Sequence, residues 1–115
     1  DGLQLRDFNY VDDCVEALLL AGANNNANGR VYNLGSSEII CLSDLAEIMI
    51  NLGVSGKYEL EPFPTERKAI DIGDYYSDYS LITKELGWAP KIDLKDGLKR
   101  TLNYYREHFS HYWDK

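Results

Sequence analysis

The chain has 115 residues, of which 44% are hydrophobic and 27% are charged, and its formal net charge is -7. These values are typical of one globular domain, residues 1–115, with enough apolar residues to bury a core. The negative charge argues against a nucleic-acid partner or an anionic membrane surface, because both require basic patches, and no apolar run reaches the ~20 residues of a membrane helix.

The first third of the sequence predicts a strand, a helix and a second strand. Residues 5–11 predict the first strand, and the apolar spacing of 11–21 predicts a helix that ends near Gly22. We expect Asp12 or Asp13 to cap this helix and to interact favourably with its dipole. After a loop of turn-forming residues, "RVYNLG" predicts a strand over 30–34.

The remainder predicts three helices and one further strand. Ser43, with Glu47 one turn later, predicts a helix that ends at Gly53, and "KYELEPF" at 57–63 predicts a strand closed by prolines. Residues 65–76 are polar and predict a loop. A short helix begins at Asp78 or Ser80, and the last helix covers 93–109, with Trp88 as a packing anchor between these two. Alternating helices and short strands favour an α/β layer.

No complete catalytic set is visible in these residues. The sequence has no glycine-rich dinucleotide turn, no P-loop and no GxSxG motif, and none of its nine tyrosines has a lysine four residues later. His108 and His111 are predicted to be solvated at the end of the last helix. Cys14 and Cys41 lack metal-ligand spacing, which predicts buried thiols in a reducing cytoplasm and no metal site.

Three segments in order carry a family resemblance: "LQLRDFNYVDDCVEALLLA", "GRVYNLGSSEIICLSDLAEI" and "DYSLITKELGWAPKIDLKDGLKRTLNYY". Together they resemble the C-terminal part of the extended short-chain dehydrogenase/reductase family, the nucleotide-sugar epimerases and dehydratases. The resemblance implies a small α/β substrate-binding domain, with short strands, about four helices and no Rossmann core. Because the chain begins at Asp1 rather than Met, we expect it to be a fragment of a longer enzyme.

The resemblance also implies a function for the longer enzyme. An N-terminal Rossmann domain would bind NAD or NADP and carry a Tyr-x-x-x-Lys pair, so this chain alone should bind no cofactor and be inactive. The reaction would begin with transient oxidation at a sugar carbon. Return of the hydride would make the enzyme an isomerase similar to UDP-glucose 4-epimerase, and loss of water would make it a dehydratase. The expected setting is carbohydrate metabolism in the cytoplasm; the sugar and the base stay open.

The same resemblance implies that Arg6 and Arg67 hold the diphosphate of a nucleotide sugar, with Lys68 as the alternative to Arg67. Planar guanidinium groups suit this role because they bind phosphate oxygens in bidentate fashion. The residues also allow simpler interpretations. Arg6 could form an ion pair with a neighbouring aspartate, and Arg67 could lie in a solvated loop. Two other functions stay open: a non-catalytic module that binds another protein, and a reductase acting on a non-sugar substrate.

Overall fold

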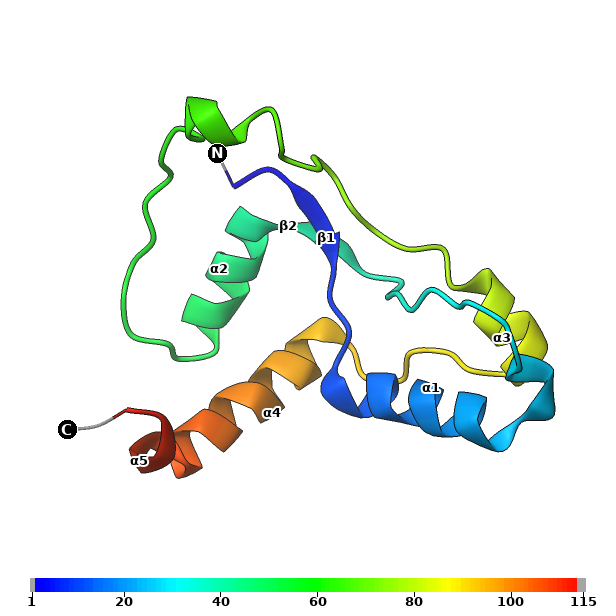
Figure 1. Ribbon diagram of the computed structural model, residues 1–115. Helices are drawn as coiled ribbons and strands as arrows, with labels where there is room; N and C mark the ends of the chain where they lie inside the picture. The colour runs from blue at the N-terminus through cyan, green and yellow to red at the C-terminus, as the bar shows by residue number, and fades with distance from the viewer. Residues whose placement is uncertain (1, 114–115) are drawn as a thin grey trace.

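The computed structural model describes residues 2–113 as a small α/β unit (Figure 1). Its elements in chain order are β1 (Leu5–Asp7), α1 (Val11–Ala23), the 3₁₀ turn η1 (Asn25–Ala27), β2 (Ile39–Cys41), α2 (Leu42–Asn51), the 3₁₀ turn η2 (Thr65–Arg67), α3 (Ser80–Leu86), α4 (Leu94–Glu107) and α5 (Phe109–Tyr112). This confirms the predicted fold class. The predicted last helix is interrupted at His108, so α5 is a separate turn.

A two-stranded antiparallel sheet lies at the centre of the molecule (Figure 1). Arg6 of β1 pairs with Ile40 of β2, and the register continues with Leu5 opposite Cys41. On its other edge, β1 is joined by a single parallel bridge between Arg6 and Tyr75. The strand is therefore enclosed between an early and a late segment of the chain.

Two of the predicted strands are wrong. Residues 30–34 and 57–63 are not strands, and the strand at 39–41 was not predicted. Val31 is 85% exposed, and the segment around it is held by side chains instead, since Arg30 and Tyr32 both bind the Glu85 carboxylate. The β-rich composition gives these residues an extended backbone, but a strand also needs a neighbour with which to pair. The described part of the chain supplies none.

The expected capping role of the acidic pair is also wrong, because Asp13 binds a different part of the chain. Tyr10 is the N-cap residue of α1, and no side chain caps this end. Asp13 is 2% exposed, and its Oδ2 accepts the backbone N–H groups of Lys91 and Ile92, both at 3.1 Å. Its carbonyl oxygen accepts the indole N–H of Trp88 at 2.9 Å. Asp12 is exposed in the first turn, where its charge suits the helix dipole.

The core is small and is centred on Trp88. Trp88 is 1% exposed and packs with Ala17 of α1 and Ile82 of α3, while the Tyr79 ring meets it edge-on at 5.9 Å between centroids. Trp88 is thus a packing anchor and packs on α3, as predicted, but its other buried partner is Ala17 of α1 rather than a residue of the last helix. The indole N–H is satisfied by Asp13, as a buried tryptophan requires.

The molecule is open in shape. Its radius of gyration is 17.1 Å, whereas a compact domain of this length would have a radius of about 13 Å. The outer side of α1 is apolar and exposed, with Leu18 at 71% and Leu19 at 68%. Within residues 2–113, no helix is both long and apolar enough to cross a membrane.

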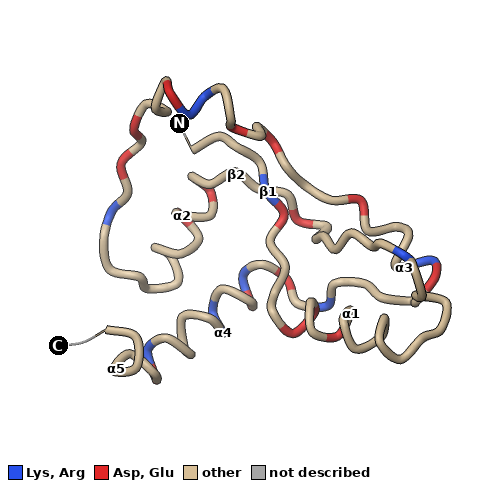
Figure 2. The backbone as a smooth tube through the Cα atoms, viewed as in Figure 1, with Lys and Arg blue, Asp and Glu red and all other residues tan. Residues whose placement is uncertain are grey.

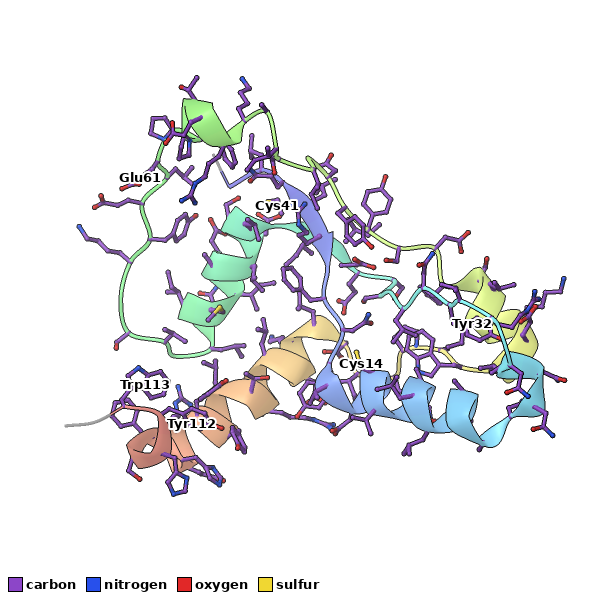
Figure 3. The ribbon with its side chains drawn as sticks, viewed as in Figure 1. Cys14, Tyr32, Cys41, Glu61, Tyr112 and Trp113 are labelled. Carbon is purple, nitrogen blue, oxygen red and sulfur yellow. The ribbon has the colours of Figure 1, made fainter. Side chains whose placement is uncertain are left out.

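Cys14 lies on α1, and Cys41 is the last residue of β2, directly before α2 (Figure 3). Both are free thiols, but they are half-buried and not buried as predicted. Partial burial raises the pKa of the Cys14 thiol, and the neighbouring Asp13 charge adds to this rise.

Replacing Asp13 by alanine should destabilise the fold, because two part-buried backbone N–H groups would lose their acceptor. Charge-assisted bonds of this kind contribute about 1.5–3 kcal/mol each, so we expect a loss of about 3 kcal/mol in the free energy of unfolding. Urea denaturation measures it. The matched control is Asp12→Ala, which removes an exposed carboxylate of the same helix turn and should change stability by less than about 0.5 kcal/mol. Equal effects of the two substitutions would contradict this role of Asp13.

Candidate functional site

Arg6, the predicted diphosphate ligand, lies in the middle of β1 and is half-buried. Its Nη1 donates to two backbone carbonyls, to Leu5 at 2.6 Å and to Gly73 at 2.7 Å. None of the ion pairs in the described part of the chain involves Arg6. The guanidinium is therefore held by carbonyl groups, and the alternative of an ion pair with Asp7, Asp12 or Asp13 is not what the structure contains.

This attachment engages only one side of the guanidinium group. A guanidinium carries five N–H donors, of which two belong to Nη1. Among residues 2–113, no hydrogen bond is found from Nε or Nη2 of Arg6. These two nitrogens form the edge that binds a carboxylate or phosphate in bidentate fashion. Arg6 thus combines a fixed nitrogen with a free pair of donors.

Asp7, the neighbour of Arg6, joins three segments of the chain. Its Oδ2 accepts the N–H of Ser36 at 3.2 Å and the N–H of Ser77 at 3.0 Å. Gly35 lies close against the same oxygen, since a Cβ added there would approach Oδ2 to 2.7 Å and the Ser77 carbonyl to 2.9 Å. The Asn9 amide, oriented to satisfy both groups, donates to the Gly35 carbonyl at 2.7 Å and accepts from its N–H at 3.2 Å. These contacts fix the backbone around the central strand.

Arg67, the second predicted ligand, is exposed at the end of η2, with Lys68 directly after it. Both belong to the long connection between α2 and α3, which runs past β1 toward α3 (Figure 1). This connection contacts Arg6 at Gly73, six residues beyond Arg67. The structure brings the two segments together but forms no direct contact between the two arginines, so the shared role of Arg6 and Arg67 remains a prediction.

An apolar hollow of about 160 Å³ opens beside the end of β1. Phe8, Asn9 and Tyr10 form one wall, and residues of α2 and α4, among them Leu45 and Leu98, form the others. The three wall residues follow Arg6 and Asp7 directly in the chain. The β1–α1 connection, which begins directly after Arg6 and Asp7, therefore forms part of this apolar hollow, whereas Arg6 itself does not line it.

The charged side chains of residues 2–113 form neither a basic stretch nor a metal-binding cluster. Figure 2 shows lysine and arginine interspersed with aspartate and glutamate along the backbone, without an extended basic stretch. Within residues 2–113, no group of three or more His, Cys, Asp or Glu side chains could hold a metal ion.

The tyrosines of "DYYSDY" divide between two roles: Tyr79 packs on Trp88, while Tyr75 and Tyr76 are 55% and 54% exposed beside β1.

Comparison with known proteins places this geometry in a family. The family model described as GDP-mannose 4,6 dehydratase matches residues 1–101. The chain is 34% identical over 109 residues to GDP-mannose 3,5-epimerase 1 of Oryza sativa subsp. japonica, covering 93% of the chain and 27% of that protein. It is 33% identical over 114 residues to dTDP-glucose 4,6-dehydratase of Streptomyces griseus, covering 99% of the chain and 34% of that protein.

The chain belongs to the NAD-dependent nucleotide-sugar epimerases and dehydratases of the extended short-chain dehydrogenase/reductase family. It spans about a third of the length of the curated relatives that it matches. UDP-glucose 4-epimerase of Thermotoga maritima, solved with UDP-glucose, superposes with a TM-score of 0.79 at 31% identity, over 95% of this chain and 34% of that one. UDP-glucuronic acid 4-epimerase of Bacillus cereus, solved with UDP-glucuronic acid and NAD, gives 0.75 at 27% identity, over 93% and 33%.

Sequence reasoning missed the residues that hold the arginine of this family member in place. Gly73 and Asp74 were not singled out, and Asp7 was considered only as an ion-pair partner of Arg6, although each has a signal in the sequence. "GD" at 73–74 is a turn dipeptide inside a polar connection, and Asp7 is a carboxylate beside a strand centre, where an unpaired charge is costly. Neither signal says which distant backbone group the side chain will meet.

Gly35→Ala should destabilise the site, because the new Cβ would lie 2.7 Å from the Asp7 carboxylate and 2.9 Å from a backbone oxygen. Such overpacking costs about 1–3 kcal/mol, since backbone must shift to relieve it. The control is Gly22→Ala in α1, where a Cβ meets nothing within 4 Å and the helix should gain up to about 1 kcal/mol. Thermal unfolding of both variants tests the difference. A neutral Gly35→Ala would show that the backbone around Asp7 is not closely packed.

Proposed function

We propose that this chain is the substrate-binding part of an NAD-dependent nucleotide-sugar epimerase or dehydratase, and that Arg6 binds the diphosphate of the nucleotide sugar. The observation that supports this role most directly is the free Nε and Nη2 edge of a half-buried arginine whose Nη1 is already fixed. A preorganised guanidinium loses little side-chain freedom when it binds an anion, so more of the interaction energy appears as affinity.

Arg67 is proposed as the second contact to the diphosphate. It is exposed on η2, in the same connection that reaches Arg6 through Gly73. The residues between 67 and 73 would have to rearrange to bring a second guanidinium to the same anion. Ordering this exposed side chain has an entropic cost, so we expect Arg67 to contribute less to affinity than Arg6.

The residues of this chain do not fit a dinucleotide, because they include no glycine-rich turn and no Tyr-x-x-x-Lys pair. The nicotinamide would supply hydride transfer in the longer protein and would be bound by its other part. The work of this chain is then to hold the diphosphate and to provide one wall of the sugar site. The hollow beside Phe8 and Tyr10, next to Arg6 in the chain, is a suitable wall for the apolar part of the ligand.

The exposed apolar side of α1 is proposed to pack on that other, N-terminal part. Four large apolar residues lie exposed on α1, and Val31 lies on the unpaired extended segment that follows it; they are Val11, Val15, Leu18, Leu19 and Val31. The relatives have about twice this chain's length of additional sequence that could cover these residues. Burial of such a surface would also give residues 30–34 the strand partner that their composition favours.

In the natural protein, Arg6→Ala should lower the affinity for its nucleotide sugar by about 2–4 kcal/mol, because charge-assisted bonds to the diphosphate are lost. Arg6→Lys should recover only part of this affinity, since an ammonium group is not a bidentate donor. Isothermal titration calorimetry measures both. Arg30→Ala is the control, because Arg30 is an exposed arginine bound to Glu85 on another part of the molecule. Unchanged affinity in Arg6→Ala would remove Arg6 from the site.

Residues 1–115 expressed alone should bind neither NAD nor NADP, because the motifs that hold a dinucleotide are absent from this sequence. Titration of each cofactor into the isolated chain checks this. Saturable binding at micromolar concentration would show that a cofactor site lies within these residues. It would contradict the proposal that the other part of the longer protein binds the cofactor.

A further inference from the structure

The connection that carries Arg67 is attached to β1 by a short segment, residues 73–75. Tyr75 donates its backbone N–H to the Leu5 carbonyl at 3.0 Å, and the Leu5 N–H donates to Oδ1 of Asp74 at 2.9 Å. The parallel bridge between Arg6 and Tyr75 lies in the same segment. Residues 73–75 thus extend the two-stranded sheet along the free edge of β1. In this pairing the Asp74 carboxylate, rather than a backbone carbonyl, accepts the Leu5 N–H.

The same segment determines how the Arg6 guanidinium lies. Gly73 has a φ of +65°, in the left-handed region that favours glycine, and its carbonyl oxygen accepts from Nη1 of Arg6 at 2.7 Å. The Leu5 carbonyl accepts from the same nitrogen at 2.6 Å. With both acceptors on Nη1, the plane of the guanidinium is fixed, and its Nε and Nη2 edge faces away from these carbonyls.

We propose that Gly73 and Asp74 are positioning residues for Arg6: they hold the 73–75 segment on β1 so that the free edge of the guanidinium is presented to an anionic diphosphate. This inference rests on the proposed function for the identity of the anion. It further implies that the contributions of Arg6 and Arg67 to diphosphate binding are coupled. Releasing residues 73–75 from β1 frees the connection that carries Arg67 and removes one of the two acceptors that orient Arg6.

The chain offers a natural assay for this coupling, because Arg67 and Lys68 are trypsin sites in the connection itself. Cleavage after them in the natural full-length protein reports how often the connection leaves the surface, independently of any ligand. Binding is measured separately with UDP-glucose and GDP-mannose. Asp74→Ala is the principal variant, because it removes the acceptor for Leu5 N–H and leaves Arg6, Gly73 and Arg67 in place.

We expect Asp74→Ala to raise the rate of cleavage after Arg67 and Lys68 by about tenfold and to weaken binding of the nucleotide sugar by about tenfold, equivalent to about 1.4 kcal/mol. Asp74→Asn should restore both values to near the wild-type level, because an amide oxygen accepts the same N–H. This rescue separates a specific acceptor from a general effect of charge. Melting curves confirm that each variant is folded.

Two glycine substitutions give a second, independent pair of test variant and control. Gly73→Ala strains a left-handed residue next to Arg6, whereas Gly29→Ala strains one with a φ of +70° in a distant loop; at neither does a Cβ meet an atom within 4 Å. Only Gly73→Ala should weaken binding and speed cleavage.

Unchanged cleavage and unchanged affinity in both Asp74→Ala and Gly73→Ala would overturn the proposal. Faster cleavage with unchanged affinity would overturn the positioning of Arg6, although the segment would still be held by Asp74. If the wild-type protein binds neither UDP-glucose nor GDP-mannose, dTDP-glucose is titrated as the third probe. Absence of binding to all three would overturn the proposed function and the positioning of Arg6 for a diphosphate, while the cleavage rates still decide whether Asp74 holds the connection.

Discussion

Backbone N–H groups from late segments of this chain are satisfied by carboxylates from its first fifteen residues, and the arrangement of the whole molecule depends on these bonds. Asp13 accepts from Lys91 and Ile92, and so fixes the connection between α3 and α4 against α1. Asp7 accepts from Ser36 and Ser77, and so gathers two connections around β1. A buried carboxylate without such donors would be costly, whereas one with two N–H partners stabilises the residues that supply them.

These bonds explain why so small a core can organise 112 described residues. Only a few apolar side chains are fully buried, around Trp88, and the outer side of α1 is left to solvent. The polar links define where the connections lie, and the apolar surface that remains on α1 and at Val31 is suited to a second layer. The chain spans about a third of its relatives' length, and the proposed N-terminal part would supply this layer.

Helices α1 to α4 could be predicted from the sequence because each has a periodic apolar face, and two of them have recognisable ends in the sequence. Gly87 ends α3 in a left-handed conformation, and Asp93 caps α4 through the N–H of Asp96. Strands were harder to predict, since a strand depends on its neighbour. "RVYNLG" has the composition of a strand and pairs with nothing described, whereas Ile39–Cys41 pairs with β1.

Arg6 could be proposed from the family motif, but its carbonyl partners could not. Gly73 lies 67 residues away, and nothing local to either residue indicates that they meet.

The central claim is that Arg6 reaches a diphosphate with one edge while its other nitrogen stays bound to the backbone. A crystal structure of the natural full-length protein with its nucleotide sugar tests this most directly. We expect diphosphate oxygens within about 2.7–3.2 Å of Nε and Nη2 of Arg6, with Nη1 still donating to the Gly73 carbonyl. A diphosphate bound away from Arg6, or an Arg6 side chain that has left Gly73 to reach it, would contradict the account.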